Sequence, residues 1–258
     1  MLIKIVAVQA RIGQPLTLDE KIHIFKQQPD FICLPEYYLL DRSITDYSRA
    51  ALRVHEHLDY YRQLSSEFGT CLIGGSVVEP EQSRLFNTVH VFDRGEEIGK
   101  YRKRHPVERE LQNGISPGDR HFVFDHEDAR IGILICGDVF YAERFVELGE
   151  HRCDIVFIPT TSPFRPDDTL SAKMERDEKY FVAGARASGA YVVKVCSVGE
   201  IFGRPLQGRS LIAAPWGIEQ RVDFTAERDQ RMLAVTLDLQ ELREFRRKMR
   251  RTAGYVPD

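Results

Sequence analysis

Short apolar runs rich in valine and isoleucine alternate with stretches of helical periodicity along most of the chain. Runs of four to eight such residues between polar segments are typical of β-strands buried in a sheet. The run IGILIC is apolar throughout, which favours a strand covered on both faces. The pattern predicts strands over residues 2–8, 31–34, 71–78, 85–92, 131–136, 154–158, 190–196, 210–213 and 232–237.

Helical periodicity fills most of the intervals between these strands. Thr17 is a suitable N-cap, and Glu20 three residues later completes a capping box for a helix that reaches about Gln28. Further helices are predicted over residues 46–68, 141–149 and 170–188. Both halves of the chain therefore run strand, helix, strand, helix, strand, strand. This order predicts an α/β fold, a four-layer α-β-β-α sandwich of two mixed sheets with helices on the outer faces.

The C-terminal stretch, about residues 238–251, predicts an amphipathic helix. Its apolar positions are Leu239, Leu242, Phe245 and Met249, and its other face carries Arg243, Arg246, Arg247, Lys248, Arg250 and Arg251. We expect the apolar side to dock on the body of the protein or on a partner subunit. A nucleic-acid patch is the less favoured interpretation, because the aromatic residues that would stack on bases are missing.

Composition narrows the classes of protein that need to be considered. The chain has 258 residues, 43% of them hydrophobic and 29% charged, which suits one globular domain over residues 1–258. A net charge of −3 gives no general attraction to nucleic acid or a membrane, and no apolar run is long enough to span a bilayer. The five cysteines are widely spaced without a CxxC pair, and no signal peptide is evident. These features favour a cytoplasmic protein without a disulfide framework or a zinc site.

Three polar residues follow predicted strands at places where a catalytic group can lie. Glu36 comes just after Pro35, which ends a strand because it cannot donate to the ladder. Cys136 ends the run IGILIC before a predicted helix, and Lys103 lies in the basic segment GKYRKRHP. Because ligand and catalytic groups of α/β sheets gather beyond the carboxyl ends of the strands, we expect these side chains in one crevice.

Each of these residues taken alone also has a structural interpretation. A carboxylate at a strand end is usually solvated, a basic run usually forms a solvated turn, and a free cysteine usually packs in the core. We keep that interpretation for the other four cysteines. At Cys136 the neighbouring helix and a cation are expected to lower the pKa of the thiol and favour the thiolate. Gly137 allows a sharp turn and leaves a backbone N–H open to a substrate oxygen.

Three segments in order resemble the signature blocks of the nitrilase, or carbon–nitrogen hydrolase, superfamily. They are LPEYYL with Glu36, YRKRHP with Lys103 and ICGDVFYAE with Cys136. The approach to the cysteine and the late segment GRSLIAAPWG are also similar to that family. The resemblance covers about residues 2–240 and implies the αββα fold already expected from the strand order.

The resemblance implies a Glu-Lys-Cys mechanism without metal or cofactor. Glu36 would act as general base, and Cys136 would attack the carbonyl or nitrile carbon to form a covalent acyl-enzyme. Lys103 and the Gly137 N–H would stabilise the oxyanion. A second glutamate of the family is matched by Glu108 or Glu110, and its distance from Pro117-Gly118 favours Glu110. Asp138 matches an acidic residue expected to fix the turn, and the resemblance also implies a homodimer or higher homo-oligomer.

The sequence departs from the family pattern at positions expected to contact the substrate, and it keeps the catalytic positions. Many members carry arginine four residues after the cysteine, where this chain has Phe140. The substrate therefore either lacks an α-carboxylate held at that position or has it held by another arginine. Tyr37 and Phe140 are candidate pocket walls, and Thr160 and Thr161 are candidate hydrogen-bonding groups for a polar substrate.

The favoured function is hydrolysis of a small linear amide or N-carbamoyl compound, with water as the second substrate. Nitrile hydrolysis and acyl transfer use the same three residues and stay open as alternatives. A catalytically silent binding or scaffold protein is the alternative from another class, and the intact Glu36, Lys103 and Cys136 argue against it. The sequence predicts neither a nucleic-acid nor a membrane partner, and it does not identify the substrate.

Overall fold

Two mixed β-sheets stack face to face and are joined along one pair of strands. The computed structural model describes residues 1–252, without the side chains of residues 250–252. The last two residues of β1 pair in parallel with β10, Ala10 with Ser197 and Arg11 with Val198. The first sheet contains β1 (Leu2–Arg11), β2 (Phe31–Cys33), β3 (Cys71–Ile73), β4 (Val77–Glu81), β5 (Arg84–Asp93), β6 (Glu96–Arg102) and β14 (Arg231–Asp238). The second contains β7 (Val123–His126), β8 (Ala129–Ile133), β9 (Ile155–Thr160), β10 (Tyr191–Ile201), β12 (Leu211–Ala214) and β13 (Gly217–Arg221), with β11 (Arg204–Leu206) on β10.

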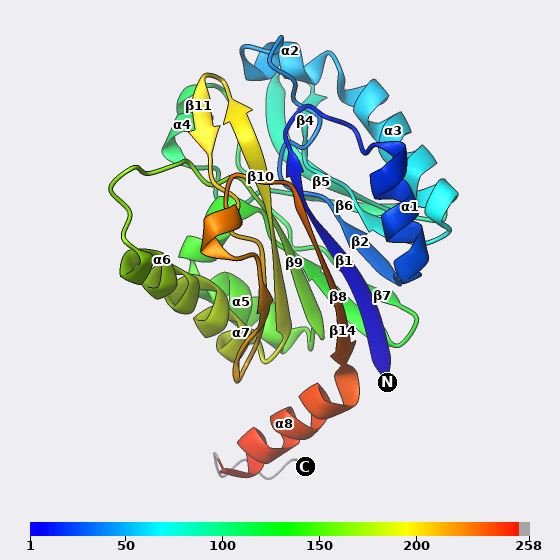
Figure 1. The fold of residues 1–258 in the computed structure, drawn as a ribbon, viewed down its shortest axis with the longest axis vertical. Coiled ribbons are helices and arrows are strands. Elements are labelled where there is room, and N and C mark those ends of the chain that lie inside the picture. Colours follow the sequence, from blue (N-terminus) through cyan, green and yellow to red (C-terminus); the bar gives the residue numbers. More distant parts are fainter. Residues whose placement is uncertain (253–258) are drawn as a thin grey trace.

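Helices cover the outer faces of both sheets (Figure 1). On the first sheet lie α1 (Leu18–Gln27) and α3 (Val54–Phe68), with α2 (Tyr47–Ala51) packed near β4. On the second lie α5 (Ala142–Glu150), α6 (Leu170–Asp177) and α7 (Ala183–Ser188). A short helix, α4 (Glu108–Gln112), follows β6, and one helical turn spans Phe224–Ala226. Thr17 and Glu20 form the expected capping box at the start of α1.

Apolar side chains fill the space between the sheets, which is the centre of the sandwich. The ring of Phe31 on β2 lies 5.6 Å from that of Phe157 on β9, centroid to centroid. Ile5 and Ile131 belong to the same buried cluster although they come from opposite sheets. A second cluster lies between the first sheet and its helices, and includes Ile24. The predicted α-β-β-α sandwich is therefore confirmed.

Three predicted elements are divided in the structure. The helix predicted over residues 46–68 is split into α2 and α3 by a turn at residues 52–53. The strand predicted over residues 71–78 is split into β3 and β4 around Gly75. A β-carbon at Gly75 would lie only 2.5 Å from that of Tyr38, so this position requires glycine. The helix predicted over residues 170–188 contains a π-helical turn, Glu178–Val182, between α6 and α7.

The strand predicted over residues 131–136 stops at Ile133, so Cys136 lies in the connection rather than in the sheet. It begins a short 3-10 helix, Cys136–Phe140, that leads into α5. Polar or glycine-containing strands β6, β7, β11 and β13 were not predicted, because they lack long apolar runs. These strands are stabilised mainly by hydrogen bonds to a neighbouring strand rather than by burial of both of their faces.

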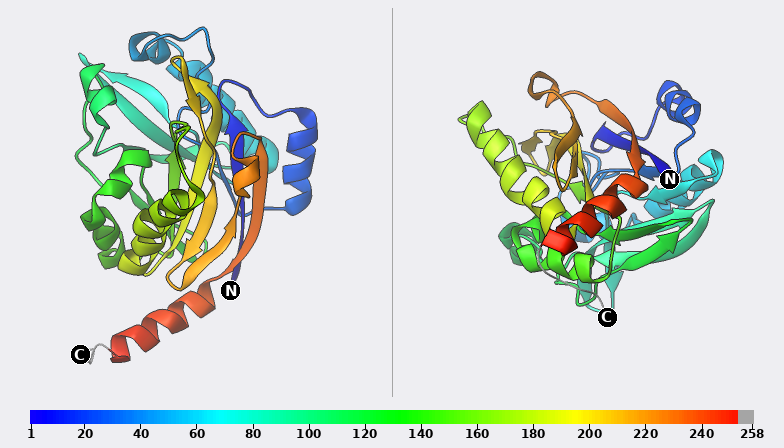
Figure 2. Two further views of the ribbon diagram at one scale, coloured as in Figure 1. Left: turned by 60° about the vertical axis from the view of Figure 1, so that its left-hand side comes forward. Right: turned by 90° about the horizontal axis from the view of Figure 1, so that it is seen from below.

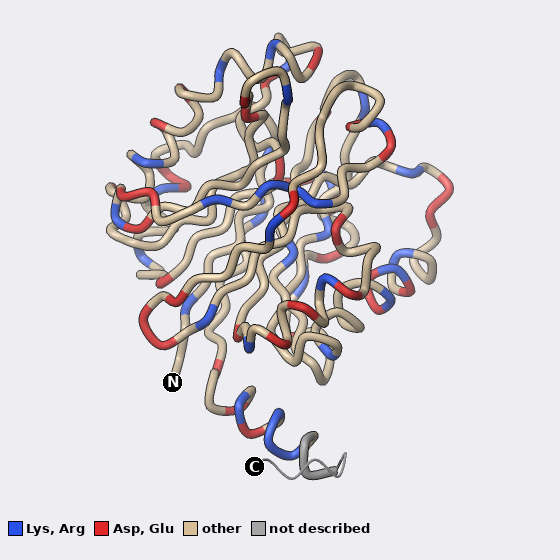
Figure 3. The backbone as a smooth tube through the Cα atoms, turned by 180° about the vertical axis from the view of Figure 1, so that it is seen from behind, with Lys and Arg blue, Asp and Glu red and all other residues tan. Residues whose placement is uncertain are grey.

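The C-terminal helix α8 (Leu239–Thr252) leaves the body of the protein at the end of β14 (Figure 2). Leu239 and Leu242 are fully buried in the central core, which confirms docking on the chain's own body at this end of the helix. Arg243 and Arg246 both pair with Asp154. Figure 3 shows acidic and basic positions mixed along the described part of α8. Arg250 and Arg251 lie outside the residues whose side chains are described.

None of the helices within residues 1–252 is both long enough and apolar enough to cross a lipid bilayer.

Candidate active site

Glu36 lies in the connection after β2, at the carboxyl end of the first sheet. Its side chain is fully buried. The Ser197 hydroxyl, on β10, donates to the Glu36 carbonyl oxygen at 2.9 Å and ties this connection to the second sheet. The next residue, Tyr37, has a φ of 54° and donates its N–H to the Ser76 hydroxyl at 3.1 Å. The solvated-carboxylate interpretation of Glu36 is therefore wrong.

Lys103 extends from the end of β6 into the same region and lies between two carboxylates. Its Nζ is 2.8 Å from Glu36 Oε1 and 2.7 Å from Glu110 Oε2. The lysine side chain is only 1% exposed, so this ion pair is shielded from water. Burial works against the ammonium, but Glu36 and Glu110 outweigh it and raise the pKa of Lys103 well above its usual value. The lysine is charged at neutral pH.

Of the two candidate second glutamates, Glu110 contacts Lys103 and Glu108 does not. Glu110 lies on α4, where its carboxylate also accepts from the Val107 N–H at 2.8 Å and the Tyr37 hydroxyl at 2.7 Å. Burial opposes ionisation of Glu110, but Lys103 and these donors lower its pKa below the usual value. Glu108 is exposed and accepts instead from the side chain of Gln112.

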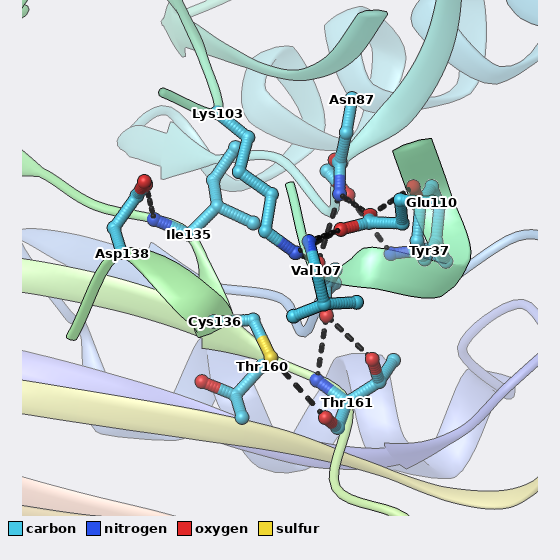
Figure 4. A network of polar contacts seen from close by, with 12 residues as sticks. Tyr37, Asn87, Lys103, Val107, Glu110, Ile135, Cys136, Asp138, Thr160 and Thr161 are labelled. Carbon is cyan, nitrogen blue, oxygen red and sulfur yellow. Dashed lines mark hydrogen bonds and ion pairs between the residues drawn. The ribbon is translucent and has the colours of Figure 1, made fainter. Parts of the chain in front are cut away.

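Asn87 on β5 is a site residue that the sequence reasoning missed (Figure 4). Its Nδ2 lies 2.8 Å from Glu36 Oε1 and 2.8 Å from Glu110 Oε1, so one amide bridges both carboxylates. The signal in the sequence was an asparagine within the apolar strand LFNTVHVF. A fully buried amide in such a strand requires polar partners, and these partners are the two glutamates.

Cys136 begins the turn after β8 with a φ of 39°, which is a strained backbone conformation for a non-glycine residue. Its Sγ donates to the Thr161 carbonyl oxygen at 3.2 Å (Figure 4). The Thr161 N–H and hydroxyl donate to Glu36 Oε2 at 2.8 and 2.5 Å. Thr161, which follows β9, therefore contacts both the thiol and the glutamate. Cys136 is also the one cysteine that is partly exposed as a residue, although its sulfur lies in a buried environment; the other four are buried.

The electrostatic environment of the thiol differs from the sequence expectation. Burial, and then the negative charge of Glu36, raise the pKa of Cys136 above its usual value, while Lys103 only partly offsets them. The prediction of a lowered thiol pKa is therefore wrong. That prediction considered a cation and a helix terminus, but neither the burial of the thiol nor a carboxylate packed beside it. The resting residue is a neutral thiol.

Asp138 connects the turn of the cysteine to the segment that follows Lys103. Its carboxylate accepts from the Ile135 N–H at 2.9 Å, the Tyr101 hydroxyl at 2.8 Å and the His105 N–H at 2.8 Å. Both oxygens are thus occupied by groups that hold the backbone, which fits the expected turn-fixing role. A β-carbon at Gly137 would lie 2.9 Å from the Val107 side chain, so the two segments approach too closely for a larger residue.

A cavity of about 440 Å³ opens beside these groups. Tyr37, Phe140, Thr160 and Thr161 line it as expected, whereas Gly137 is not among the lining residues. Phe140 is 57% exposed and meets the ring of Tyr180 edge-on at 5.1 Å, so it forms part of the rim. The Thr160 hydroxyl donates to the Ile158 carbonyl oxygen within the chain.

The cavity is also lined by basic residues that the sequence reasoning did not place there. They are Arg109, Arg165, Arg176, Lys194, Arg204 and Arg209. These residues come from separate segments, and nothing local in the sequence indicates that they converge. Within residues 1–252, no group of three or more His, Cys, Asp or Glu side chains is arranged to hold a metal ion.

Comparison with known proteins places the chain in a family. Residues 7–247 match the model of the carbon-nitrogen hydrolase family. An omega-amidase of Xenopus laevis is 29% identical over 233 residues, covering 84% of this chain and 80% of that protein. An omega-amidase of Mus musculus is 27% identical over 239 residues, covering 87% and 82%.

Solved structures share the fold at low sequence identity. A carbon-nitrogen hydrolase from Helicobacter pylori superposes with a TM-score of 0.81 at 19% identity, over 96% of this chain and 93% of that one. An amidase from a Nesterenkonia species gives a TM-score of 0.74 at 18% identity, over 98% and 95%. The chain belongs to the carbon–nitrogen hydrolase family. The omega-amidases among its relatives support an amidase-type enzyme within it.

Exchanging each candidate glutamate for glutamine tests the geometry around Lys103. Glu110→Gln removes a carboxylate that contacts the ammonium, and we expect kcat for amide hydrolysis to fall about 100-fold with a smaller change in KM. Glu108→Gln is the matched control and should leave both constants within about twofold, since it alters only an exposed contact. Equal effects of the two substitutions would contradict the assignment.

The state of the thiol can be measured directly. The ultraviolet absorbance of the Cys136 thiolate is obtained by subtracting the spectrum of Cys136→Ala from that of the wild type. We expect this difference to stay flat between about pH 6 and pH 9, whereas an ordinary thiol ionises near pH 8.5. The reason is the raised pKa of the buried thiol beside Glu36. A thiolate band from Cys136 already present near neutral pH would show that Lys103 dominates instead.

Proposed function

We propose that this protein hydrolyses the non-peptide C–N bond of a small linear amide or N-carbamoyl compound through a thioester on Cys136. The observation that carries the proposal is the arrangement around one cavity. There the Lys103 ammonium lies 2.7–2.8 Å from Glu110 and Glu36, and Thr161 contacts both Glu36 and the thiol. These groups supply a nucleophile, a base and a cation without further components.

Acylation begins from the neutral thiol, so a base is required. Glu36 takes the proton of Cys136 as the sulfur attacks the substrate carbonyl carbon. The carbonyl π electrons move to oxygen, and the oxyanion is stabilised by Lys103 and the Gly137 N–H. When the C–N bond breaks, protonated Glu36 returns its proton to the leaving nitrogen. Ammonia or an amine departs, and the acyl group stays on sulfur as a thioester.

Deacylation repeats the same proton transfers with water. Glu36 removes a proton from a water molecule, whose oxygen attacks the thioester carbon. The second oxyanion is held by the same donors as the first. Collapse of this intermediate breaks the C–S bond, and the Cys136 sulfur recovers a proton from Glu36 as the carboxylic acid product leaves.

The contacts of the buried group support Glu36 as the base. Both carboxylates contact Lys103 and accept from Asn87. Thr161 contacts both Glu36 and the Cys136 thiol. After burial, the charge of Glu36 raises the pKa of that thiol more than the charge of Glu110 does, which supports Glu36 as the acceptor of its proton. Glu110 thus acts by positioning Lys103.

The amide class is favoured over the alternatives by the curated relatives, which are omega-amidases. Nitrile hydrolysis and acyl transfer would use the same thioester chemistry, and a silent binding protein would keep the fold without turnover. We further propose a cytoplasmic location, which is supported by the five free cysteines.

A panel of small amides, N-carbamoyl amines and nitriles tests the activity through ammonia release. We expect at least one amide to be hydrolysed, and Cys136→Ala to lose at least about 10⁴-fold of that rate, because the proposed thioester forms on this sulfur. Cys71→Ala is the control, since Cys71 is buried on β3 away from the cavity.

Turnover that persists in Cys136→Ala would contradict the thioester mechanism. Turnover of nitriles alone would favour nitrile hydrolysis as the function. Release of ammonia only in the presence of an acyl acceptor such as hydroxylamine would favour acyl transfer. No turnover, together with slow alkylation of Cys136 by iodoacetamide relative to the other cysteines, would favour the silent protein.

We also propose that the protein forms a homodimer or higher homo-oligomer. Met249 on α8 and Val146 on α5 are 53% and 46% exposed, and both border a broad groove beneath α8. Such exposed apolar side chains around a projecting helix are suited to contact a second copy. Light scattering after size-exclusion chromatography should give at least twice the mass of one chain. The mass of one chain at every concentration would exclude the assembly.

A further inference from the structure

Four hydrogen-bond donors surround the Glu36 carboxylate, two at each oxygen. Oε1 accepts from Lys103 Nζ and from Asn87 Nδ2, both at 2.8 Å. Oε2 accepts from the main-chain N–H of Thr161 at 2.8 Å and from the Thr161 hydroxyl at 2.5 Å (Figure 4). An ionised carboxylate offers about four lone-pair positions, so each position of Glu36 is occupied by a donor. Such donors favour the ionised form of the group that accepts them.

Glu36 needs these donors because its side chain is fully buried. Burial favours the neutral form of a carboxyl group, and so does a second negative charge nearby, here that of Glu110. A protonated Glu36 would be unable to take the proton of Cys136 in the proposed reaction. The donors therefore decide how far the pH can fall before the base is lost.

The Thr161 hydroxyl differs from the other three donors. Lys103 and Asn87 also contact Glu110, and the N–H of Thr161 belongs to the main chain. Within the described residues, the one hydrogen bond of the hydroxyl is to Glu36. A hydroxyl can also accept, which an ammonium or an amide N–H cannot do. It is therefore the donor that can turn away, and still stay in contact, when Glu36 takes up a proton.

The other titratable groups around Glu36 keep one charge state from weakly acidic to neutral pH. Despite burial, Glu36 and Glu110 raise the pKa of Lys103 well above its usual value, so it stays charged. Despite burial, Lys103 lowers the pKa of Glu110, so it stays ionised. Burial is the main cause of a raised pKa in the remaining three groups, which are neutral: Cys136, Tyr37 and Tyr47. Loss of activity at acidic pH should therefore report on Glu36.

We propose that the Thr161 hydroxyl is a positioning group that keeps Glu36 ionised and thereby sets the lower pH limit of catalysis. The inference rests on the proposed function and adds a residue beyond Glu36, Lys103 and Cys136. When the sulfur attacks, its proton moves to Glu36 while the sulfur electron pair forms the new bond to carbon. The Thr161 hydroxyl keeps its own proton throughout and only turns from donor to acceptor.

Thr161→Val removes the hydroxyl and leaves the main-chain N–H and carbonyl oxygen in place. The measurement is the pH dependence of kcat/KM for the best amide of the panel. We expect the acidic limb of this profile to move to higher pH by about one unit, because the ionised carboxylate loses one donor. Above that limb, kcat/KM should stay within about threefold of the wild type, since three donors still hold the carboxylate. Thr161→Ser restores the hydroxyl and should return the limb to its wild-type position.

Thr88→Val is the matched control. The Thr88 hydroxyl also donates to a carboxylate, Glu79 Oε2 at 2.9 Å, but Thr88 does not line the cavity. This variant should keep the wild-type profile. An acidic limb that stays in place in Thr161→Val would overturn the proposal. So would a value of kcat/KM that falls by the same factor at every pH, because that result indicates a purely structural role. Thr161→Ala, which also lacks the hydroxyl, replaces the valine variant if the latter does not fold.

Alkylation of Cys136 by iodoacetamide provides a measurement without turnover. The neutral thiol again needs a base as its sulfur attacks, so the alkylation rate should show the same acidic limb and the same shift in Thr161→Val. If the limb of alkylation moves but the wild type hydrolyses no amide, the proposed function fails and the role of Thr161 stands. If amides are hydrolysed but neither limb moves, the role of Thr161 fails alone.

Discussion

The structure depends on one buried ion pair network, in which the Lys103 ammonium lies between Glu36 and Glu110. Three separate elements supply these groups: the connection after β2, the end of β6 and the helix α4. Burying any one of these charges alone would be strongly unfavourable. Removing one partner of a buried ion pair typically lowers the stability of a fold by about 3–5 kcal/mol. The segments must therefore meet in one arrangement, and Asn87 reinforces it by donating to both carboxylates. The site is thus also a constraint on the fold.

The second sheet contacts the side chains of this network through Thr161. Thr161 follows β9 and contacts both Glu36 and Cys136, which come from opposite sheets. The parallel pairing of β1 with β10 and the Ser197–Glu36 hydrogen bond hold the same edges together. The strand ends of both sheets therefore face one crevice, where a strained turn presents the thiol. Because the layers are packed rigidly across the central core, the distances among the groups are fixed before a substrate arrives.

The sequence could predict what depends on local pattern. The periodicity of strands and helices predicted the sandwich, and Thr17 with Glu20 predicted where a helix begins. The ends of the predicted strands indicated Glu36, Lys103 and Cys136. It could not predict Asn87 or Lys194, since a polar residue within an apolar strand does not reveal which distant group it meets. The sign of the Cys136 pKa shift was missed for the same reason. It depends first on the burial of the thiol and then on the position of Glu36, and both are set by the packing of the two sheets.

The charge of the buried group also determines how the proposed reaction begins. Burial, and then the negative charge of Glu36, raise the pKa of Cys136, while Lys103 only partly offsets them. A thiol in this environment keeps its proton at neutral pH, so a base must remove the proton as the sulfur attacks. The carboxylate that raises the pKa is also the one that Thr161 connects to the thiol. The raised pKa and the general base are therefore two consequences of one placement of Glu36 between the sheets.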